Sequence, residues 1–219
     1  MNEFSQLNLF AFPIFKIRID PNSYDKEKII EDIKYNKSLK KKACTYVSGF
    51  GTDHKKDSFE KPYDDVTFRS INFDKLRVEY SKVFDKFFNE NIFTKKPFRW
   101  ELDIRSYSAI LEGQRIGSHN HLTEDSFSTC HYVNFKKEHV FTRFNNPAFY
   151  SSLAKYVQVS TINVLDFSSP DNSYLLEDFT MPCQEDDMII FPSILNHEVP
   201  EQPSTNEPRI TISTNIEIK

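Results

Sequence analysis

The spacing of apolar residues changes near residue 96 of this 219-residue chain. Before that point, two segments, at about residues 24–41 and 73–92, carry apolar residues at helical spacing, such as Ile29, Ile30 and Ile33 in the first. Residues 9–19 instead read as an extended strand, in which Pro13 indicates an edge position or a bulge. The N-terminal part is therefore predicted to hold one strand and two helices.

Beyond residue 96 the pattern becomes a series of short β-like runs separated by turns. The clearest runs are residues 98–111, 127–135, 157–167, 188–191 and 209–218, and the proline-rich residues 200–208 read as a loop between two strands. Many short strands favour a barrel or sandwich. We expect a single domain over residues 1–219 that is mainly β, with two facing antiparallel sheets in residues 96–219. Residues 1–95 would add a strand and helices packed outside one sheet.

Composition narrows the range of partners. The formal net charge of −4 argues against a general nucleic-acid binder, which normally has a basic face. The four glycines are too few for the usual phosphate-binding loops, which argues against nucleotide binding. Cys44, Cys130 and Cys183 are scattered, which fits a reducing compartment. With no long apolar segment and no basic signal-peptide region, we expect a cytoplasmic protein without membrane or nucleic-acid partners.

Three histidines are candidate metal ligands. Residues i and i+2 of a strand point to the same face, so His119 and His121 can reach one metal ion; the alternative is two exposed polar side chains flanking a turn. His197 follows a buried-looking strand that ends in a proline turn. Its alternative role is to cap that turn through backbone hydrogen bonds.

A basic residue opens the last predicted strand. By two-residue periodicity, Arg209, Thr211 and Ser213 share one face. If that face looks into a barrel, a guanidinium and a hydroxyl form a bidentate site for a carboxylate. If it looks outward, it is an ordinary solvated face, and periodicity does not choose between the two.

The order of these motifs resembles a known enzyme family. The motifs are His119-x-His121, Ser128-Thr-Cys-His-Tyr132-Val, Phe191-Pro-Ser193, His197 and Arg209-Ile-Thr-Ile-Ser. In this order they are similar to the 2-oxoglutarate- and Fe(II)-dependent oxygenases found widely in bacteria and their phages. The similarity is to the prolyl-hydroxylase-like branch of the double-stranded β-helix fold, a jelly-roll or cupin-like barrel, and is strongest over residues 105–216.

The resemblance implies that His119 and His197 bind Fe(II). The wider superfamily usually has Asp or Glu two positions after the first ligand, which completes a face of two histidines and one carboxylate. This chain has His121 there. The third ligand is therefore His121, the nearby Glu124 or Asp125, or water.

The resemblance also implies a site for 2-oxoglutarate as cosubstrate. Arg209 matches the residue that pairs with the far carboxylate, Thr211 matches the hydroxyl two positions on, and Tyr132 matches a strand tyrosine that often binds the same group. Tyr132 is alternatively a core residue, and His131 takes its part if the register differs by one. We expect turns at Asp187 and at Gly113, before the ligand strand.

The implied activity is hydroxylation of a protein side chain or a small metabolite with O₂ and 2-oxoglutarate. One alternative is a cupin-type metal dioxygenase, since Gly113-x₅-His119-x-His121 fits the first cupin motif and three-histidine sites are usual there. Another is a non-catalytic β-barrel, for instance a structural or binding protein of a phage. The primary substrate and the oligomeric state stay open, with a homodimer as one possibility.

Overall fold

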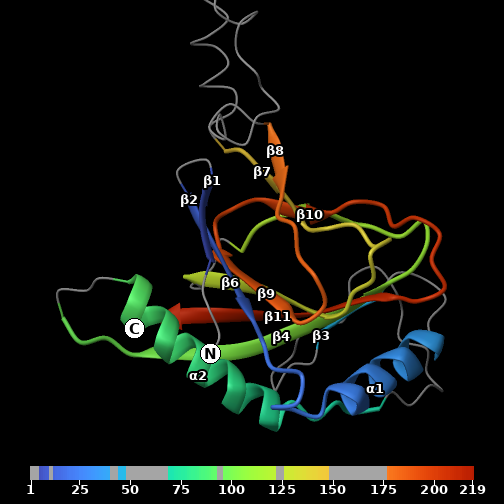
Figure 1. Cartoon of the computed structure of the whole chain (residues 1–219), viewed down its shortest axis with the longest axis horizontal. Coiled ribbons are helices and arrows are strands. Elements are labelled where there is room, and N and C mark those ends of the chain that lie inside the picture. The colour runs from blue at the N-terminus through green and yellow to red at the C-terminus, as the bar shows by residue number, and fades with distance from the viewer. Residues whose placement is uncertain are drawn as a thin grey trace, which may run out of the picture.

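The structure is a computed structural model that describes residues 5–9, 12–39, 44–47, 69–92, 96–121, 126–147 and 177–219. The predicted strand at residues 157–167 lies outside these ranges. Within them, the chain forms one seven-stranded and one four-stranded sheet, both antiparallel, which we call the larger and the smaller sheet (Figure 1).

The larger sheet has the strand order β1-β2-β9-β6-β11-β4-β3. Its strands span Ser5–Leu9 (β1), Phe12–Arg18 (β2), Asp187–Pro192 (β9), Phe127–Asn134 (β6), Arg209–Ile218 (β11), Trp100–Ile110 (β4) and Cys44–Val47 (β3). The smaller sheet has the order β5-β10-β7-β8, with strands Ile116–His119 (β5), His197–Val199 (β10), Arg143–Asn145 (β7) and Asp178–Thr180 (β8).

From β4 onward the chain passes repeatedly between the two sheets. β4, β6, β9 and β11 belong to the larger sheet, whereas β5, β7, β8 and β10 belong to the smaller one. Apart from the consecutive β7 and β8, successive described strands therefore alternate between the two facing sheets, which is the jelly-roll arrangement of a double-stranded β-helix. The predicted fold class, mainly β with flanking helices, is confirmed.

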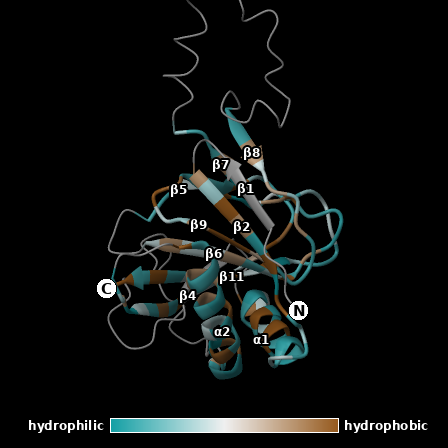
Figure 2. Ribbon diagram, turned by 60° about the vertical axis from the view of Figure 1, so that its left-hand side comes forward, coloured by the Kyte–Doolittle hydropathy of each residue, from teal (hydrophilic) through white to brown (hydrophobic). Residues whose placement is uncertain are grey.

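Two helices cover the outer face of the larger sheet, as predicted. They are α1 (Lys26–Leu39) and α2 (Asp74–Asn91), and both lie on the side of that sheet away from the smaller one (Figures 1 and 2). Tyr80 and Phe84 of α2 share one apolar cluster with Ile210 and Ile212 of β11, and all four side chains are fully buried. Neither helix of the described chain has the length and apolar content that a membrane crossing needs.

A second apolar cluster lies between the two sheets. It includes Tyr132 from β6, Ile189 and Phe191 from β9, and Phe144 from β7. Alternate residues of β9, such as Met188 and Ile190, point instead into the core under the helices. Burial on both faces explains why this strand is an unbroken apolar run.

The predicted positions of the long strands agree with the structure. Several short strands were either merged into one predicted strand or not predicted at all. Residues 9–19 are not one strand: β1 and β2 form an antiparallel hairpin in which Leu9 pairs with Phe12. Pro13 lies in the part of β2 that precedes its pairing with β9, which begins at Phe15. The short strands β7, β8 and β10 carry no detectable period because each has three residues.

Two turns adopt the left-handed backbone conformation. Gly113, in the turn before β5, has φ of 72°, and Asp186, immediately before β9, has φ of 71°. Asp187 closes the second turn, where its Oδ2 accepts a hydrogen bond from the Gln184 backbone N–H at 2.9 Å. Both expected turns are therefore present, and aspartate is among the few non-glycine residues that tolerate this conformation.

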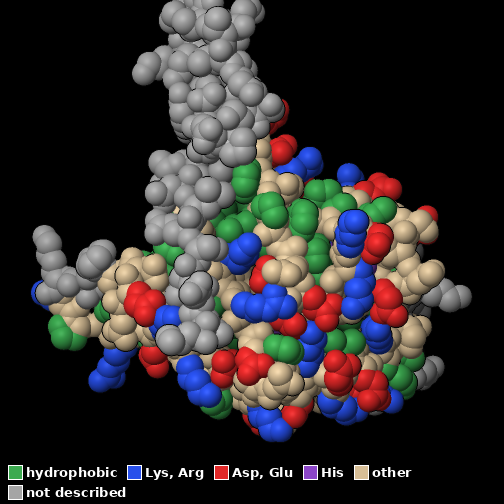
Figure 3. Space-filling view, viewed as in Figure 1, with side chains coloured by type: hydrophobic (Ala, Val, Ile, Leu, Met, Phe, Trp, Pro, Cys, Tyr) green, Lys and Arg blue, Asp and Glu red, His purple; other side chains and the backbone are tan. Residues whose placement is uncertain are grey.

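Acidic and basic side chains are interspersed on the face shown in Figure 3, with no large area of one sign. Ion pairs also join the two signs of charge in the described residues. Lys34 pairs with Glu207, and Arg69 pairs with Glu31 and Asp32. This face therefore lacks the basic patch that nucleic-acid binding requires.

Candidate metal centre

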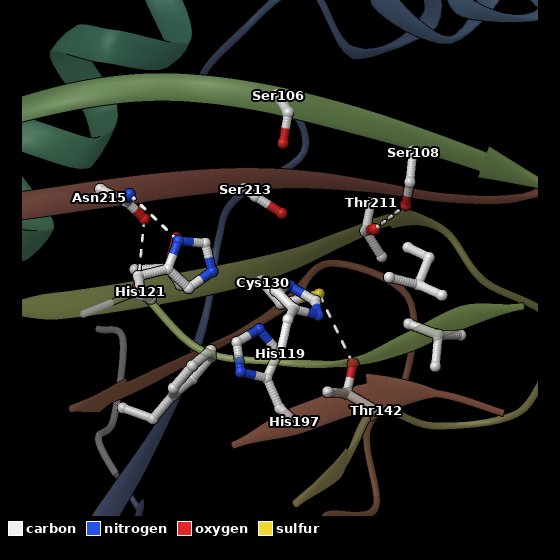
Figure 4. Close-up of a pocket in the computed structure, with 15 residues that line it drawn as sticks. Ser106, Ser108, His119, His121, Cys130, Thr142, His197, Thr211, Ser213 and Asn215 are labelled. Carbon is white, nitrogen blue, oxygen red and sulfur yellow. Dashed lines mark hydrogen bonds between the residues drawn. The ribbon is translucent and has the colours of Figure 1, made fainter. Parts of the chain in front are cut away.

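Two histidines from neighbouring strands of the smaller sheet lie side by side. His119 ends β5, His197 begins β10, and they are partners in the antiparallel register of the two strands. Their ring centroids are 4.3 Å apart. His121 follows just after β5, and one nitrogen of each of the three rings lies within 4.8 Å of the others. The three side chains converge at one point of the barrel (Figure 4).

Backbone carbonyls orient two of the three rings. His119 Nδ1 lies 2.8 Å from the Gly117 carbonyl oxygen, and His197 Nδ1 lies 2.9 Å from that of Leu195. Because a carbonyl only accepts, each Nδ1 carries the proton and each Nε2 keeps its lone pair. This is the arrangement in which imidazole binds a metal ion.

Burial keeps His197 neutral. Desolvation, followed by the neighbouring His119, lowers the pKa of His197 to about 3. His197 is buried whereas His119 is exposed. The centre is thus open to solvent on the His119 side and closed on the His197 side.

His121 is held differently. Its backbone N–H donates to the Ser193 carbonyl at 2.9 Å, and its Nδ1 lies 3.4 Å from Asn215 Nδ2. The strand ends at His119, so His121 does not share a strand with it as expected, yet the ring still reaches the centre. Glu124 and Asp125, the alternative third ligands, lie outside the described residues.

A cavity of about 160 Å³ adjoins the three histidines. One wall consists of small polar side chains from β4 and β11: Ser106, Ser108, Thr211, Ser213 and Asn215. Ile116 of β5 and Val199 of β10 line the cavity from the smaller sheet, and Phe191 of β9 adds a third apolar side chain. The predicted face of Arg209, Thr211 and Ser213 therefore looks into the barrel. A polar wall facing an apolar one suits a small ligand with oxygen atoms along one side.

Arg209 is fully buried at the end of this wall. Its Nε donates to the Val140 carbonyl at 3.0 Å, Nη2 to Thr142 Oγ1 at 3.1 Å and Nη1 to Thr211 Oγ1 at 3.4 Å. No carboxylate pairs with it in the part of the chain that the structure describes. The guanidinium lies directly behind two hydroxyls that line the cavity. A buried cation without an acidic partner favours an anionic ligand.

Tyr132 lies beside Arg209 and does not line the cavity. The Arg209 Cζ is 5.1 Å from the Tyr132 ring centroid. The Tyr132 hydroxyl donates to Thr142 Oγ1 at 2.8 Å and accepts the Thr142 backbone N–H at 3.2 Å. His131 points to the helical side, where its Nδ1 is 2.8 Å from the Tyr80 hydroxyl oxygen. The alternative that assigned it to the cosubstrate therefore fails.

Several residues of the site were not predicted. Asn215 continues the alternation of Arg209, Thr211 and Ser213, so strand period could have found it. Ser108 is likewise paired with Thr211 across β4 and β11, with their hydroxyl oxygens 2.7 Å apart. Thr142 precedes a three-residue strand and carries no sequence signal.

The fold and site define a jelly-roll barrel with a three-histidine centre and a buried arginine at the end of its cavity. Residues 107–215 match the family described as "Putative 2OG-Fe(II) oxygenase". The chain belongs to this family, whose members use Fe(II) and 2-oxoglutarate. The three imidazoles fit such a metal, and the buried Arg209, which pairs with no carboxylate of the described residues, fits a dianionic cosubstrate.

Solved structures with similar folds have low sequence identity. A 2OG-Fe(II) oxygenase family oxidoreductase from Burkholderia pseudomallei has a TM-score of 0.43 at 11% identity, covering 68% of this chain and 61% of that protein. A Pseudomonas putida prolyl-4-hydroxylase has a TM-score of 0.44 at 9% identity, covering 100% and 93%. The non-heme alpha-ketoglutarate-dependent epimerase SnoN, from nogalamycin biosynthesis, has 0.45 at 14% identity, covering 92% and 76%. No curated protein matches the chain in sequence.

Proposed function

We propose that the protein is an Fe(II)- and 2-oxoglutarate-dependent hydroxylase, acting on a protein side chain or a small metabolite. The observation that supports this most directly is the pairing of two features in one cavity. Three histidine nitrogens lie within 4.8 Å of one another at its mouth. A fully buried arginine without a carboxylate partner in the described chain lies behind its far end.

In this proposal His119, His121 and His197 hold the metal. Two of them present Nε2 because Nδ1–H is bonded to a backbone carbonyl. Three neutral imidazoles leave Fe(II) with its charge of +2, which dianionic 2-oxoglutarate neutralises. The bound pair supplies oxidising chemistry in which O₂ gives one oxygen atom to succinate, with release of CO₂, and the other to a substrate C–H bond.

The far carboxylate of 2-oxoglutarate is bound by polarised hydroxyls. Thr142 Oγ1 accepts hydrogen bonds from both Arg209 Nη2 and the Tyr132 hydroxyl. Its own proton has only a weak acceptor, Cys130 Sγ at 3.8 Å, within the described chain. Thr142 therefore offers its proton to the ligand, and Thr211 does so when Ser108 donates to it, while Arg209 supplies the positive charge behind both hydroxyls.

The remaining side chains orient the reactants and limit water. Ile116, Phe191 and Val199 form an apolar wall that favours the carbon chain of the cosubstrate over water. The open side of the centre is at His119, which is exposed. The primary substrate reaches the metal from that side.

One observation favours a second candidate. All three metal-facing residues are histidines, the donor set typical of cupin-type dioxygenases that need no 2-oxoglutarate. Such an enzyme has no use for a buried arginine beside the cavity, so we place this candidate second.

Anaerobic titration separates the candidates. We expect purified protein to bind Fe(II), and added 2-oxoglutarate to produce the metal-to-ligand charge-transfer band of the chelated complex. Admission of O₂ should then release succinate. Iron binding without the band would favour the cupin-type enzyme, and no iron binding would leave a non-catalytic barrel.

A further inference from the structure

The third histidine differs from the other two in what its Nδ1 faces. His119 and His197 each bond to a backbone carbonyl, which can only accept. The Nδ1 of His121 faces the side-chain amide of Asn215 at 3.4 Å. An amide carries both an acceptor and a donor, so its orientation decides which nitrogen of His121 carries the proton.

Asn215 is part of a buried chain of polar groups. Ser128 Oγ lies 3.1 Å from Asn215 Oδ1 and 2.9 Å from Ser193 Oγ. All three side chains are buried, at 4%, 2% and 1% exposure for Asn215, Ser128 and Ser193. They come from β11, β6 and the turn after β9, which brings three parts of the chain against His121.

The hydrogen bonds that link these polar groups to His121 can run in either of two directions. As the structure has it, the amide N–H of Asn215 donates to His121 Nδ1, so a neutral ring carries its proton on Nε2 and cannot bind a metal through that atom. A half-turn of the amide exchanges its oxygen and nitrogen with little change in shape. His121 Nδ1–H then donates to Asn215, Asn215 donates to Ser128, and Ser128 donates to Ser193. Each of these three hydrogen bonds keeps a donor and an acceptor, and Nε2 of His121 carries the lone pair that a metal ion binds.

We propose that Asn215 is a positioning residue for His121, and that the Ser193–Ser128–Asn215 chain sets the tautomer in which His121 becomes the third metal ligand. The inference rests on the proposed metal site. After the half-turn, the buried amide oxygen of Asn215 accepts the Nδ1–H of His121, and a neutral imidazole then takes the place of the usual carboxylate as the third ligand.

Two substitutions at Asn215 should differ in their effect on metal affinity. In Asn215→Asp, the carboxylate accepts from both His121 Nδ1–H and Ser128, so Co(II) affinity should equal or exceed that of wild type. Asn215→Leu keeps the approximate volume but removes the acceptor, and affinity should fall about 10- to 100-fold, as for other groups that orient metal ligands. The control is Asn36→Leu. Asn36 lies on α1, outside the cavity, and its buried amide donates to the Arg69 carbonyl and the Tyr107 hydroxyl.

Co(II) affinity is measured from its visible absorption, and thermal melting confirms that each variant folds. Long-range ¹H–¹⁵N spectra of the Zn(II)-loaded protein then report the tautomer directly. We expect His121 to carry its proton on Nδ1 in the wild type and in Asn215→Asp. Equal affinities for the Leu and Asp variants, or a Zn(II)-loaded His121 with its proton on Nε2, would overturn the role of Asn215. Failure of the wild type to bind either metal would overturn the proposed function itself.

Discussion

His119 and His197 are direct partners in the pairing of β5 with β10, with ring centroids 4.3 Å apart. Each is anchored through Nδ1 to a carbonyl two residues before it, Gly117 and Leu195 respectively. The pairing of the smaller sheet thus brings two of the three candidate metal ligands together, and backbone carbonyls orient their rings, whereas the ring of His121 lies against the Asn215 side chain.

Loss of either anchored histidine should abolish iron binding. His197→Ala removes one of three protein donors, so we expect no measurable Fe(II) uptake in anaerobic titration, and the same for His119→Ala. The matched control is His139→Ala, which removes a buried histidine bonded to the Glu207 carbonyl, away from the centre. Full iron occupancy in His197→Ala would mean that the ligands are misassigned.

Arg209 should serve the cosubstrate and not the metal. Truncating one partner of a buried charge pair costs roughly 2–5 kcal/mol, so Arg209→Ala should weaken 2-oxoglutarate affinity by roughly thirtyfold or more. Iron affinity without 2-oxoglutarate should change little. Arg209→Lys should restore only part of the loss, because an ammonium lacks the planar fork. Unchanged 2-oxoglutarate binding in Arg209→Ala would mean that Arg209 does not serve the cosubstrate.

Thr142 should contribute to cosubstrate binding although nothing in the sequence marks it. Thr142→Val keeps the shape but removes the hydroxyl that Arg209 and Tyr132 polarise. A hydrogen bond to a charged group is worth about 1.5–3 kcal/mol, so 2-oxoglutarate affinity should fall about tenfold or more. Tyr132→Phe should have a smaller effect in the same titration, since it removes only one donor to Thr142. A larger loss for Tyr132→Phe would indicate direct contact between Tyr132 and the ligand.

Stability should fall with pH below neutrality partly through His131. This residue is fully buried, and desolvation, followed by the nearby Lys26, lowers its pKa to about 3. The unfolded chain takes up the proton near the ordinary value of about 6.5. The contribution of His131 is therefore complete above that value and is lost as pH falls from there toward 3, by up to about 1.4 kcal/mol per pH unit.

Urea unfolding between pH 6 and pH 4.5 measures this slope. In His131→Gln the side chain does not titrate. The slope of the unfolding free energy against pH should therefore be smaller than in the wild type, by the amount that corresponds to about one proton, whatever the absolute stability of the variant. His197, with its pKa also lowered to about 3, contributes equally to both proteins. Identical slopes would show that His131 does not stay neutral in the folded state.

Asp186 should tolerate asparagine better than alanine. It has φ of 71°, and its carboxylate pairs with the buried Lys26 ammonium at 2.5 Å. Asp186→Ala combines left-handed backbone strain with loss of a buried ion-pair partner, a cost of about 3 kcal/mol or more. Asp186→Asn accepts the backbone conformation and keeps an oxygen for Lys26, so it should lose clearly less in urea unfolding. Equal losses would mean that neither the left-handed conformation nor the retained oxygen contributes to stability at this turn.

The amino-acid sequence by itself determined the long elements. Regular periods over many residues predicted both helices and the strands β4, β6 and β11, because each buries one face against the rest of the protein. The same two-residue period placed Arg209 and Thr211 on one face. The motif order then predicted the family, the metal and the cosubstrate.

Only the tertiary structure decided which strands pair and which distant side chains contact one another. Strands of three residues, such as β7 and β10, show no period, yet their pairing brings His197 to His119. Thr142 reaches Arg209 and Asn215 reaches His121 through contacts between distant parts of the chain. Local pattern reports which face of an element is buried, because burial of that face repeats along the element. The partner across the barrel, and the nitrogen of His121 that carries the proton, depend on long-range packing that no local period records.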